Sequence, residues 1–470
     1  MNKACLQLLC SLALGLAPCA AWAQLEINSS PNVVGSGARA LGMGSAFIAI
    51  ADDATAASWN PGGLTQLERP ELSLVYSFKS NTEDFSSSSH RGLNFENTVN
   101  YNEINYGSFV YPIPRTIAGR NMVVSLNILK QYDFDRDLDF RFTDVGAAAG
   151  GIVNLAAKYE YSQRGGLSSF SPAFGFEITD KLSMGVVANI YDQDLLPDNE
   201  WKTRNNIRQR TFFNSSALPF SITQIDEDFK DFKGHNYTIG LLYKPSERWS
   251  IGAVYHTKWS ADVNYEQGVR LASGTLVGTG GGERPKEYTF PSAFGLGAAY
   301  RFPNDKLTLS FDVTRREWNQ FEVLDPESTR RAFRRTSGVT GLNKGLTEID
   351  PTYTVRLGAE YVFVNDAKPK QNFLPSLRAG LFYDPEPSGG RKDLWYGVGV
   401  NGKSQQGSGD PNDFFGFSLG AGVLVKDRVN LDLAYVYRFG DGARDDTFGL
   451  FGTEADVEQH TIYMSTVVYF

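Results

Sequence analysis

Hydrophobic and polar side chains alternate along most of the chain after residue 70. Within Val429–Phe439 the odd-numbered positions are apolar, whereas the other face carries Asn430, Asp432 and Arg438. A repeat of two residues is the pattern of a β-strand with one apolar face. It predicts fourteen strands, over residues 71–80, 104–112, 121–133, 154–179, 181–192, 235–245, 248–260, 288–302, 306–316, 352–364, 375–384, 413–425, 428–438 and 459–470.

Two all-β folds have this pattern. A soluble β-sandwich turns its apolar faces inward, and a transmembrane β-barrel turns them outward. The polar faces here carry Gly, Ser and charges of both signs, as a barrel lumen does. Trp249 and Trp259 lie at the two ends of one predicted strand, where membrane barrels place aromatic girdles. We therefore predict a transmembrane antiparallel β-barrel.

The connections between the strands support the barrel. Short turns, such as 179–181 and 426–428, alternate with long polar stretches. Short periplasmic turns and long outer loops are typical of bacterial outer-membrane barrels, whereas long loops are unusual in compact soluble domains. The long stretches are 81–103, 134–153, 193–234, 261–287, 317–351, 385–412 and 440–458.

Both chain ends carry export features. Residues 1–23 have a lysine, an apolar run and an Ala21-Trp22-Ala23 cleavage site, which predicts a signal peptide cleaved before Gln24. The last predicted strand ends in Phe470, which resembles the C-terminal signal of outer-membrane barrels, so we expect recognition by the barrel-assembly machinery and insertion among outer-membrane lipids.

Composition excludes several kinds of chemistry. All three cysteines lie in the signal peptide, so the mature chain has no thiol nucleophile and no cysteine-ligated metal. The formal charge is −8 and no basic cluster occurs, which argues against nucleic-acid binding. The four histidines share no metal-ligand spacing, and no catalytic or phosphate-binding motif is found. We expect no enzyme activity, no cofactor and no metal.

Residues 24–70 precede the first strand and are apolar and rich in glycine. A barrel of fourteen strands leaves a lumen unless something fills it. We predict that this segment is a hatch inside the barrel formed by residues 71–470. Asp52 or Asp53 would cap a short helix over Ala54–Trp59 or form a salt bridge in the lumen, with a cation site less favoured. The expected hatch positions are Gly35, Gly37, Gly42, Gly44, Phe47, Asp52, Asp53, Asn60 and Pro61.

The order of these features resembles the FadL-type outer-membrane transporters of long-chain fatty acids and hydrocarbons. The resemblance rests on GARALGMGSAFIAIADDATAASWNPGGL at residues 37–64, on NYTIGLLYKP at 236–245 and on the terminal Phe470. It recurs at Pro291–Tyr300, Leu357–Tyr361 and Phe417–Val425. The family has an Asn-Pro-Ala motif at the end of the hatch, and here Asn60-Pro61 is followed by Gly62.

The resemblance implies passive transport of a hydrophobic ligand. The ligand would meet an apolar groove on the outer loops, then a pocket against the hatch, and hatch movement would free a path. In the family, the exit is a lateral gap in the wall at a kinked strand. The Tyr106-Gly107 region and the predicted strand over 154–179 are the two candidates for this kink. Gly165-Gly166 in the latter indicates a bulge, or else a division into two strands. We expect the groove among the apolar residues of the loop over 194–233, which would either capture the ligand or only pack the loop on itself. These residues are Leu195, Leu196, Trp201, Phe212, Phe213, Leu218, Phe220 and Ile222.

Charged residues on the predicted lumen face have both signs. They would form salt bridges across the interior, or an arginine among them would bind a ligand carboxylate. These residues are Arg301, Asp312, Arg356, Glu360, Arg378, Asp432 and Arg438. The N-terminal sequence also resembles a branch of the superfamily that serves as secretion-system attachment barrels. A non-transporting binding barrel is therefore the alternative function.

Overall fold

The structure is a computed structural model. It describes residues 36–87, 93–114, 119–148, 151–218, 220–271, 276–279, 283–303, 305–328, 334–339, 343–346, 349–365, 371–387, 395–398, 404–406, 412–445 and 453–470. Gly35 and the predicted signal peptide lie outside the described residues. Within the described part of the chain, no helix is long and apolar enough to cross a membrane.

Fourteen antiparallel strands close into a barrel, which confirms the predicted fold class. Each pairs with the next along the wall, and β24 returns to β1. The wall strands are β1 (Glu71–Ser87), β2 (Phe95–Pro112), β3 (Met122–Asp133), β5 (Gly151–Thr179), β6 (Leu182–Asp192), β9 (Ser221–Tyr243), β10 (Trp249–His256), β14 (Ala293–Arg301), β15 (Leu307–Arg316), β18 (Thr352–Val362), β19 (Phe373–Asp384), β22 (Phe414–Val425), β23 (Val429–Asp445) and β24 (Thr453–Tyr469).

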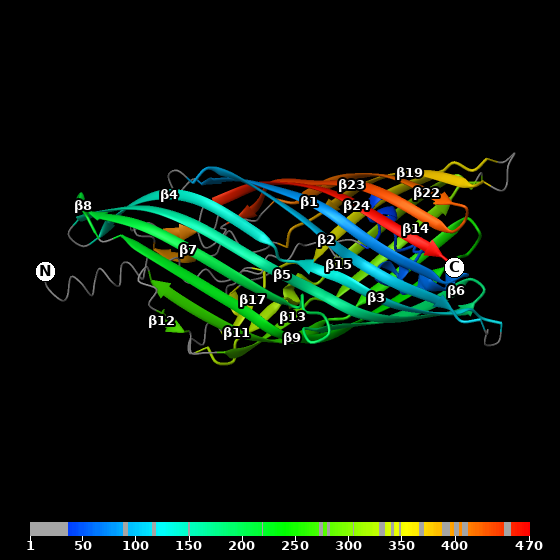
Figure 1. Ribbon diagram of the computed structural model, residues 1–470, viewed down its shortest axis with the longest axis horizontal. Coiled ribbons are helices and arrows are strands. Elements are labelled where there is room, and N and C mark those ends of the chain that lie inside the picture. Colours follow the sequence, from blue (N-terminus) through cyan, green and yellow to red (C-terminus); the bar gives the residue numbers. More distant parts are fainter. Residues whose placement is uncertain are drawn as a thin grey trace.

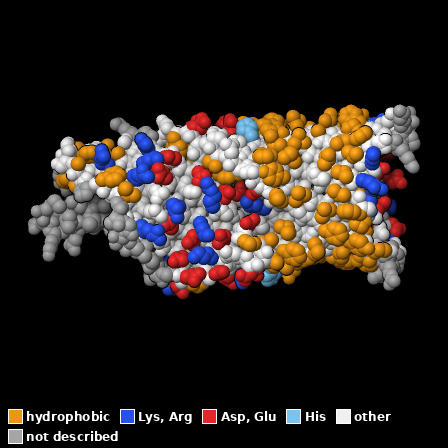
Figure 2. Space-filling model, viewed as in Figure 1, with side chains coloured by type: hydrophobic (Ala, Val, Ile, Leu, Met, Phe, Trp, Pro, Cys, Tyr) orange, Lys and Arg blue, Asp and Glu red, His pale blue; other side chains and the backbone are white. Residues whose placement is uncertain are grey.

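The alternation in the sequence corresponds to the two sides of the wall, with apolar residues facing outward and polar residues facing the lumen. On β18, Leu357 is half exposed, whereas Arg356 and Glu360 on the other face are buried. Leu381 and Leu419 on neighbouring strands are also half exposed. Figure 2 shows the result on the visible face, a hydrophobic band around one half of the molecule and mixed charges over the other. The band covers the part of the wall that encloses residues 36–67 (Figure 1).

The wall continues beyond this band as an extracellular extension. Five stretches predicted as loops, 81–103, 134–153, 193–234, 261–287 and 440–458, are largely strands, so that prediction is wrong for them. Outside lipid a strand can carry polar residues on both faces, and the sequence pattern there resembles a loop. The additional strands are β4 (Arg136–Ala148), β7 (Glu200–Phe213), β8 (Ser216–Ala217), β11 (Trp259–Leu271), β12 (Leu276–Thr279), β13 (Arg284–Phe290), β16 (Glu322–Leu324) and β17 (Arg335–Ser337), and β20 (Trp395–Val398) pairs separately with β21 (Ser404–Gln406).

Two predicted strands need correction. The strand over 248–260 is divided at residues 257 and 258, and the strand over 288–302 is divided at 291 and 292. The first break reverses the inward and outward faces, so Trp249 is 49% exposed whereas Trp259 is 7% exposed. Trp259 therefore does not belong to a membrane girdle. The fourth predicted strand is the single strand β5, in which Gly165 has a φ of 126°.

Residues 36–67, called the hatch below, lie inside the barrel (Figure 1). They form the helices α2 (Ala38–Gly42) and α3 (Ala56–Trp59) and the 3-10 helix η1 (Pro61–Gln66). Further 3-10 turns are η2 (Trp318–Gln320) and η4 (Lys344–Leu346). The hatch core contains Met43, Phe47 and Leu64, none of which has exposed surface. The segment is therefore a packed element of the fold.

Candidate functional site

The hatch backbone contacts the wall directly, because glycines face it from the surrounding strands. A Cβ at Gly358 would lie 2.4 Å from the Met43 carbonyl oxygen, and one at Gly380 would lie 2.1 Å from the Gly44 nitrogen. Gly44 itself has a φ of 64°, which favours glycine. Further close approaches of this kind occur at Gly185, Gly240 and Gly252. The hatch fits the lumen closely at this level.

Side-chain hydrogen bonds hold the same interface. The Asn60 amide donates to the Ile48 carbonyl at 2.8 Å and to the Leu241 carbonyl of β9 at 2.9 Å. Its oxygen accepts from Gly62 at 3.0 Å, and Pro61 occupies the first turn of η1. The Asn60-Pro61 pair thus starts a helix and links two parts of the hatch to the wall.

The wall supplies the remaining anchors. The Ser418 hydroxyl accepts from the Gly44 N–H at 2.8 Å and donates to the Gly42 carbonyl at 3.0 Å. Asp312 accepts from the Ile48 N–H at 2.9 Å. On β2, the Ser108 hydroxyl donates to the Ala54 carbonyl at 2.8 Å. Anchors therefore reach the hatch from several sides.

The hatch aspartates form ionic contacts. Arg39 pairs with Asp52 and lies 3.5 Å from Asp53. Asp53 accepts from the Thr55 N–H at 2.9 Å, and α3 begins at Ala56 without a side-chain cap. The helix predicted over Ala54–Trp59 is thus present in a shorter form, α3. Asp53 bonds the turn at its start, and both aspartates also take part in the salt-bridge alternative.

Three of the predicted lumen charges join one ion network. Glu360 contacts Arg39 at 2.8 Å and Arg378 at 2.7 Å, and Arg378 contacts Asp432 at 2.6 Å. Arg39 carries no signal in the sequence, because it is one cation in an apolar segment. The network joins the hatch to three strands of the wall.

The other predicted lumen charges lie around this network. Arg356 faces Asp312 across the β15–β18 ladder. Arg438 pairs with Asp384 at 2.9 Å and with Glu386 at 3.4 Å. Arg301 is exposed at the periplasmic end of β14.

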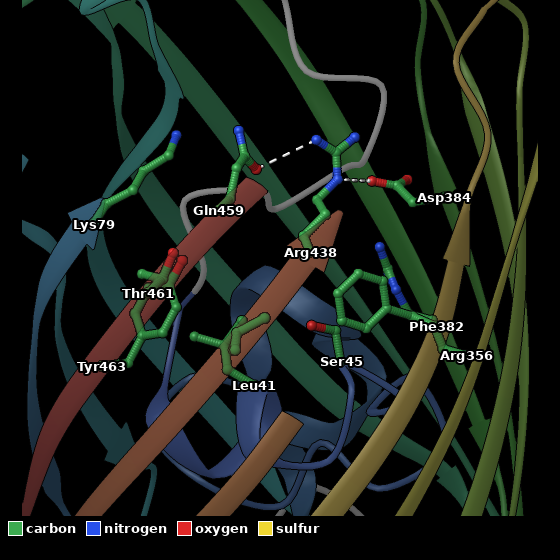
Figure 3. Close-up of a pocket in the computed structure, with 11 residues that line it drawn as sticks. Leu41, Ser45, Lys79, Arg356, Phe382, Asp384, Arg438, Gln459, Thr461 and Tyr463 are labelled. Atoms are coloured by element: carbon green, nitrogen blue, oxygen red, sulfur yellow. Dashed lines mark hydrogen bonds and ion pairs between the residues drawn. The ribbon is translucent and has the colours of Figure 1, made fainter. Parts of the chain in front are cut away.

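A small cavity of ≈ 60 Å³, called the hatch pocket below, lies on the extracellular side of the hatch. Leu41 and Ser45 of the hatch form its floor, and Lys79, Arg356 and Arg438 bring positive charge to it from three strands (Figure 3). The remaining lining residues are Phe382, Asp384, Val436, Gln459, Thr461 and Tyr463. Arg438 is directed at Asp384 and Gln459 (Figure 3).

A larger cavity of ≈ 310 Å³, called the periplasmic cavity below, lies on the other side of the hatch. Ala49, Ile50 and Gln66 of the hatch contribute to its lining. The turn after β9 contributes Lys244, Glu247 and Arg248. Desolvation lowers the pKa of Lys244, whereas the nearby Asp52 opposes this shift. Cavities thus flank the hatch on both sides.

Comparison with known proteins identifies the family. A family model described as outer membrane protein transport protein (OMPP1/FadL/TodX) matches residues 17–448. The chain belongs to this family. Family and fold together place this FadL/TodX-type channel in the outer membrane. A comparison with curated proteins returned no match.

Solved structures share the fold of this FadL/TodX-type channel. A Pseudomonas aeruginosa FadL homologue has a TM-score of 0.55 at 14% identity, covering 93% of this chain and 98% of the other. The P. putida toluene transporter TodX has a TM-score of 0.51 at 12% identity, covering 93% and 99%.

In this FadL/TodX-type channel, an aromatic cluster lies on the extracellular side of the hatch. Its rings stack closely: Tyr191 and Trp259 have centroids 4.4 Å apart, Trp259 and Phe290 4.3 Å, and Trp201 and Phe229 4.5 Å. Beside it, the Lys286 ammonium lies 3.3 Å from the Tyr265 ring centroid, and burial lowers the pKa of Lys286 to about 8.

The residues predicted for an outer groove do not form one groove. Trp201 is buried in the aromatic cluster, whereas Phe220 is exposed near the far end of the β7–β9 hairpin. At about 3.3 Å per residue, Trp201 and Phe212 lie roughly 35 Å apart along β7. Leu195 is exposed, and the partly exposed members are Leu196, Phe212, Phe213, Leu218 and Ile222. Their apolar character was visible in the sequence, but their pairing as a hairpin was not.

The hydrogen-bonded wall changes beside one of the predicted kink regions. β2 pairs with β3 from Pro112 to Tyr106 and no further towards the extracellular side. The register against β1 shifts at this point, between Val75 and Tyr76. Lys130 of β3 bridges to Glu103 by an ion pair. The Tyr106-Gly107 region therefore marks an interruption in the wall.

Proposed function

We infer that this chain is a passive outer-membrane channel for amphipathic compounds with an apolar chain and a carboxylate, such as long-chain fatty acids, and that it is not an enzyme. The observation that carries this is the hatch pocket, where Lys79, Arg356 and Arg438 converge above an apolar hatch residue, Leu41.

The charge of the pocket supports a carboxylate ligand. Arg438 is already bound by Asp384 and Glu386. Lys79 has no carboxylate within ion-pair distance among the described residues, and Arg356 adds a guanidinium to the pocket from β18, on the side away from Lys79 (Figure 3). Guanidinium and ammonium groups bind carboxylates through short, charge-assisted hydrogen bonds. An uncharged hydrocarbon would gain nothing from these groups.

The size of the pocket supports gating by the hatch. The hatch pocket, at ≈ 60 Å³, is much smaller than the periplasmic cavity, at ≈ 310 Å³. Leu41 and Ser45 belong to the hatch, so hatch movement would enlarge the pocket. We propose that ligand binding favours this displaced hatch, since a ligand shifts an equilibrium only through differential affinity.

An aromatic hydrocarbon is the second candidate ligand. The solved relatives include a protein named as a toluene transporter. The stacked cluster of Trp201, Phe229, Trp259 and Phe290 would suit a flat apolar ring. A fatty acid would need the positive charge of the hatch pocket to bind its carboxylate, whereas an aromatic hydrocarbon would not.

Uptake by a host strain that lacks its own fatty-acid channel tests the function. The chain should restore uptake of labelled palmitate, and Lys79→Gln combined with Arg356→Gln should reduce that uptake about tenfold, because charge-assisted hydrogen bonds are lost. Lys426→Gln, an exposed cation in a periplasmic turn, serves as the control.

Toluene accumulation by the same strains completes the experiment. Palmitate uptake at the level of the empty strain, with toluene uptake intact, would favour the hydrocarbon channel. Loss of both, with a secretion protein co-purifying, would favour the attachment barrel.

A further inference from the structure

We propose that the periplasmic cavity is a second binding site, which receives the carboxylate of the transported compound and releases it to the periplasm. This inference rests on the proposed function. It assigns a path beneath the hatch, in addition to any path through the wall.

The two cavities lie in line along one strand. On β18, Arg356 borders the hatch pocket and Glu360 borders the periplasmic cavity. Four residues of strand span about 13 Å. Between them, Gly358 contacts the Met43 carbonyl of the hatch. The hatch segment that begins at Met43 therefore separates the two cavities along this strand.

The barrier at this point consists of close backbone contacts. Gly358 and Gly380 of the wall approach Met43 and Gly44 without intervening side chains. The lining of the periplasmic cavity includes Ala49 and Ile50, which follow in the same hatch segment. A shift of this segment would thus connect the hatch pocket with the space below.

Most charges around the periplasmic cavity already have partners. Arg39 is bound by Asp52 and Glu360, and Glu360 is also bound by Arg378. Arg248 donates to the Phe302 carbonyl at 2.6 Å and pairs with Asp305 at 3.1 Å. These contacts leave little capacity for a ligand at the partnered groups.

Lys244 and Arg301 are different. Both line the periplasmic cavity, and neither has a carboxylate within ion-pair distance among the described residues. Glu247 is the remaining charged group of the lining. Ala49, Ile50, Trp249 and Ala299 supply apolar surface. Two available cations beside apolar walls match a carboxylate with the start of its alkyl chain.

Photolabelling of the full chain in outer-membrane vesicles tests this site. The probe is a palmitate analogue with a diazirine next to the carboxyl group, and labelled peptides are mapped by mass spectrometry. We expect labelling of the hatch at Ala49–Ile50 and of the wall at Ala299, which is buried and lines the periplasmic cavity. Lys244→Gln combined with Arg301→Gln should reduce this labelling about tenfold and leave labelling around Leu41 unchanged.

Two controls separate charge recognition from misfolding. Arg428→Gln removes an exposed cation from another periplasmic turn and should have no effect. With the unaltered protein, the methyl ester of the probe should label Ala49–Ile50 less than the acid does. Equal labelling by ester and acid would contradict carboxylate recognition even if the double variant failed to fold.

The remaining outcomes distinguish this site from the proposed function. Labelling around Leu41 and the Tyr106 region, with none at Ala49–Ile50, would overturn the periplasmic site and leave the channel in place. Absence of specific labelling at both cavities, together with absent palmitate uptake, would overturn both proposals.

Discussion

At the scale of single residues, the contact between hatch and wall depends on the absence of side chains. A Cβ at Gly380 would lie within 2.5 Å of three hatch backbone atoms in Met43 and Gly44. Such distances lie far inside van der Waals contact, so one of the two backbones would have to shift. The wall is held by hydrogen bonds on both sides, and the hatch is the part with more freedom to move.

Gly380→Ala should therefore displace the hatch and make the channel leak. We expect higher ion conductance in planar bilayers and greater sensitivity of cells to large antibiotics that the outer membrane excludes. Ala379→Val is the matched control, because Ala379 is the neighbour of Gly380 on β19 and its side chain is exposed on the outer face of the wall. Equal conductance of Gly380→Ala and the unaltered protein would show that the glycine contact does not seal the lumen.

Asn60 links the hatch to the wall through one amide. Asn60→Ala would leave the Ile48 and Leu241 carbonyls without this donor, at a cost of about 1–3 kcal/mol for the buried groups. We expect faster proteolysis of the hatch in detergent, with the wall intact. Asn102→Ala, which removes an exposed side-chain hydrogen bond to Tyr76, should leave the rate unchanged. Similar rates for both variants would contradict the anchoring role of Asn60.

At the scale of elements, one ion network connects α2, β18, β19 and β23. Glu360 lies at its centre, between Arg39 and Arg378. Both partners are largely buried, so the loss of the carboxylate charge would leave two guanidinium groups without this counter-charge. Breaking a buried pair in this way is strongly destabilising.

Glu360→Gln should lower the free energy of unfolding by about 3 kcal/mol. Urea unfolding in detergent micelles measures the change. Glu458→Gln is the control, because Glu458 is exposed and lies 3.9 Å from His460, and an exposed pair contributes at most about 1 kcal/mol. A change for Glu360→Gln as small as that for the control would mean that the network does not stabilise the hatch.

The sequence predicted these elements where lipid imposes a pattern. Alternation on β18, β22 and β23 was clear, because one face meets lipid and the other the lumen. β7 was missed because it carries polar residues on both faces, Thr203 and Asn205 on the buried one. β4 does alternate, with Leu138, Phe140 and Phe142 buried, and this signal was overlooked among the charged residues between them. The lumen charges were found as residues on one face, but their pairing with Arg39 depends on how the hatch folds.

At the scale of the whole molecule, the barrel is divided into a lipid-facing half around the hatch and an extracellular extension with mixed surface charge (Figure 2). The aromatic cluster and the hatch pocket both lie on the extracellular side of the hatch, and they are lined by different strands of the wall. A hydrophobic compound that enters from outside would thus find stacked rings on one side of the lumen and positive charge on the other, above a closely fitted barrier.

The most direct test of this account is a density map of the full chain in lipid nanodiscs with palmitate, at a resolution that shows ligands. We predict elongated density in the lumen, with the carboxylate beside Lys79 and Arg356 and the alkyl chain in space released by a displaced hatch. Unchanged hatch contacts at Gly358 and Gly380, with no ligand density anywhere in the lumen, would contradict the account.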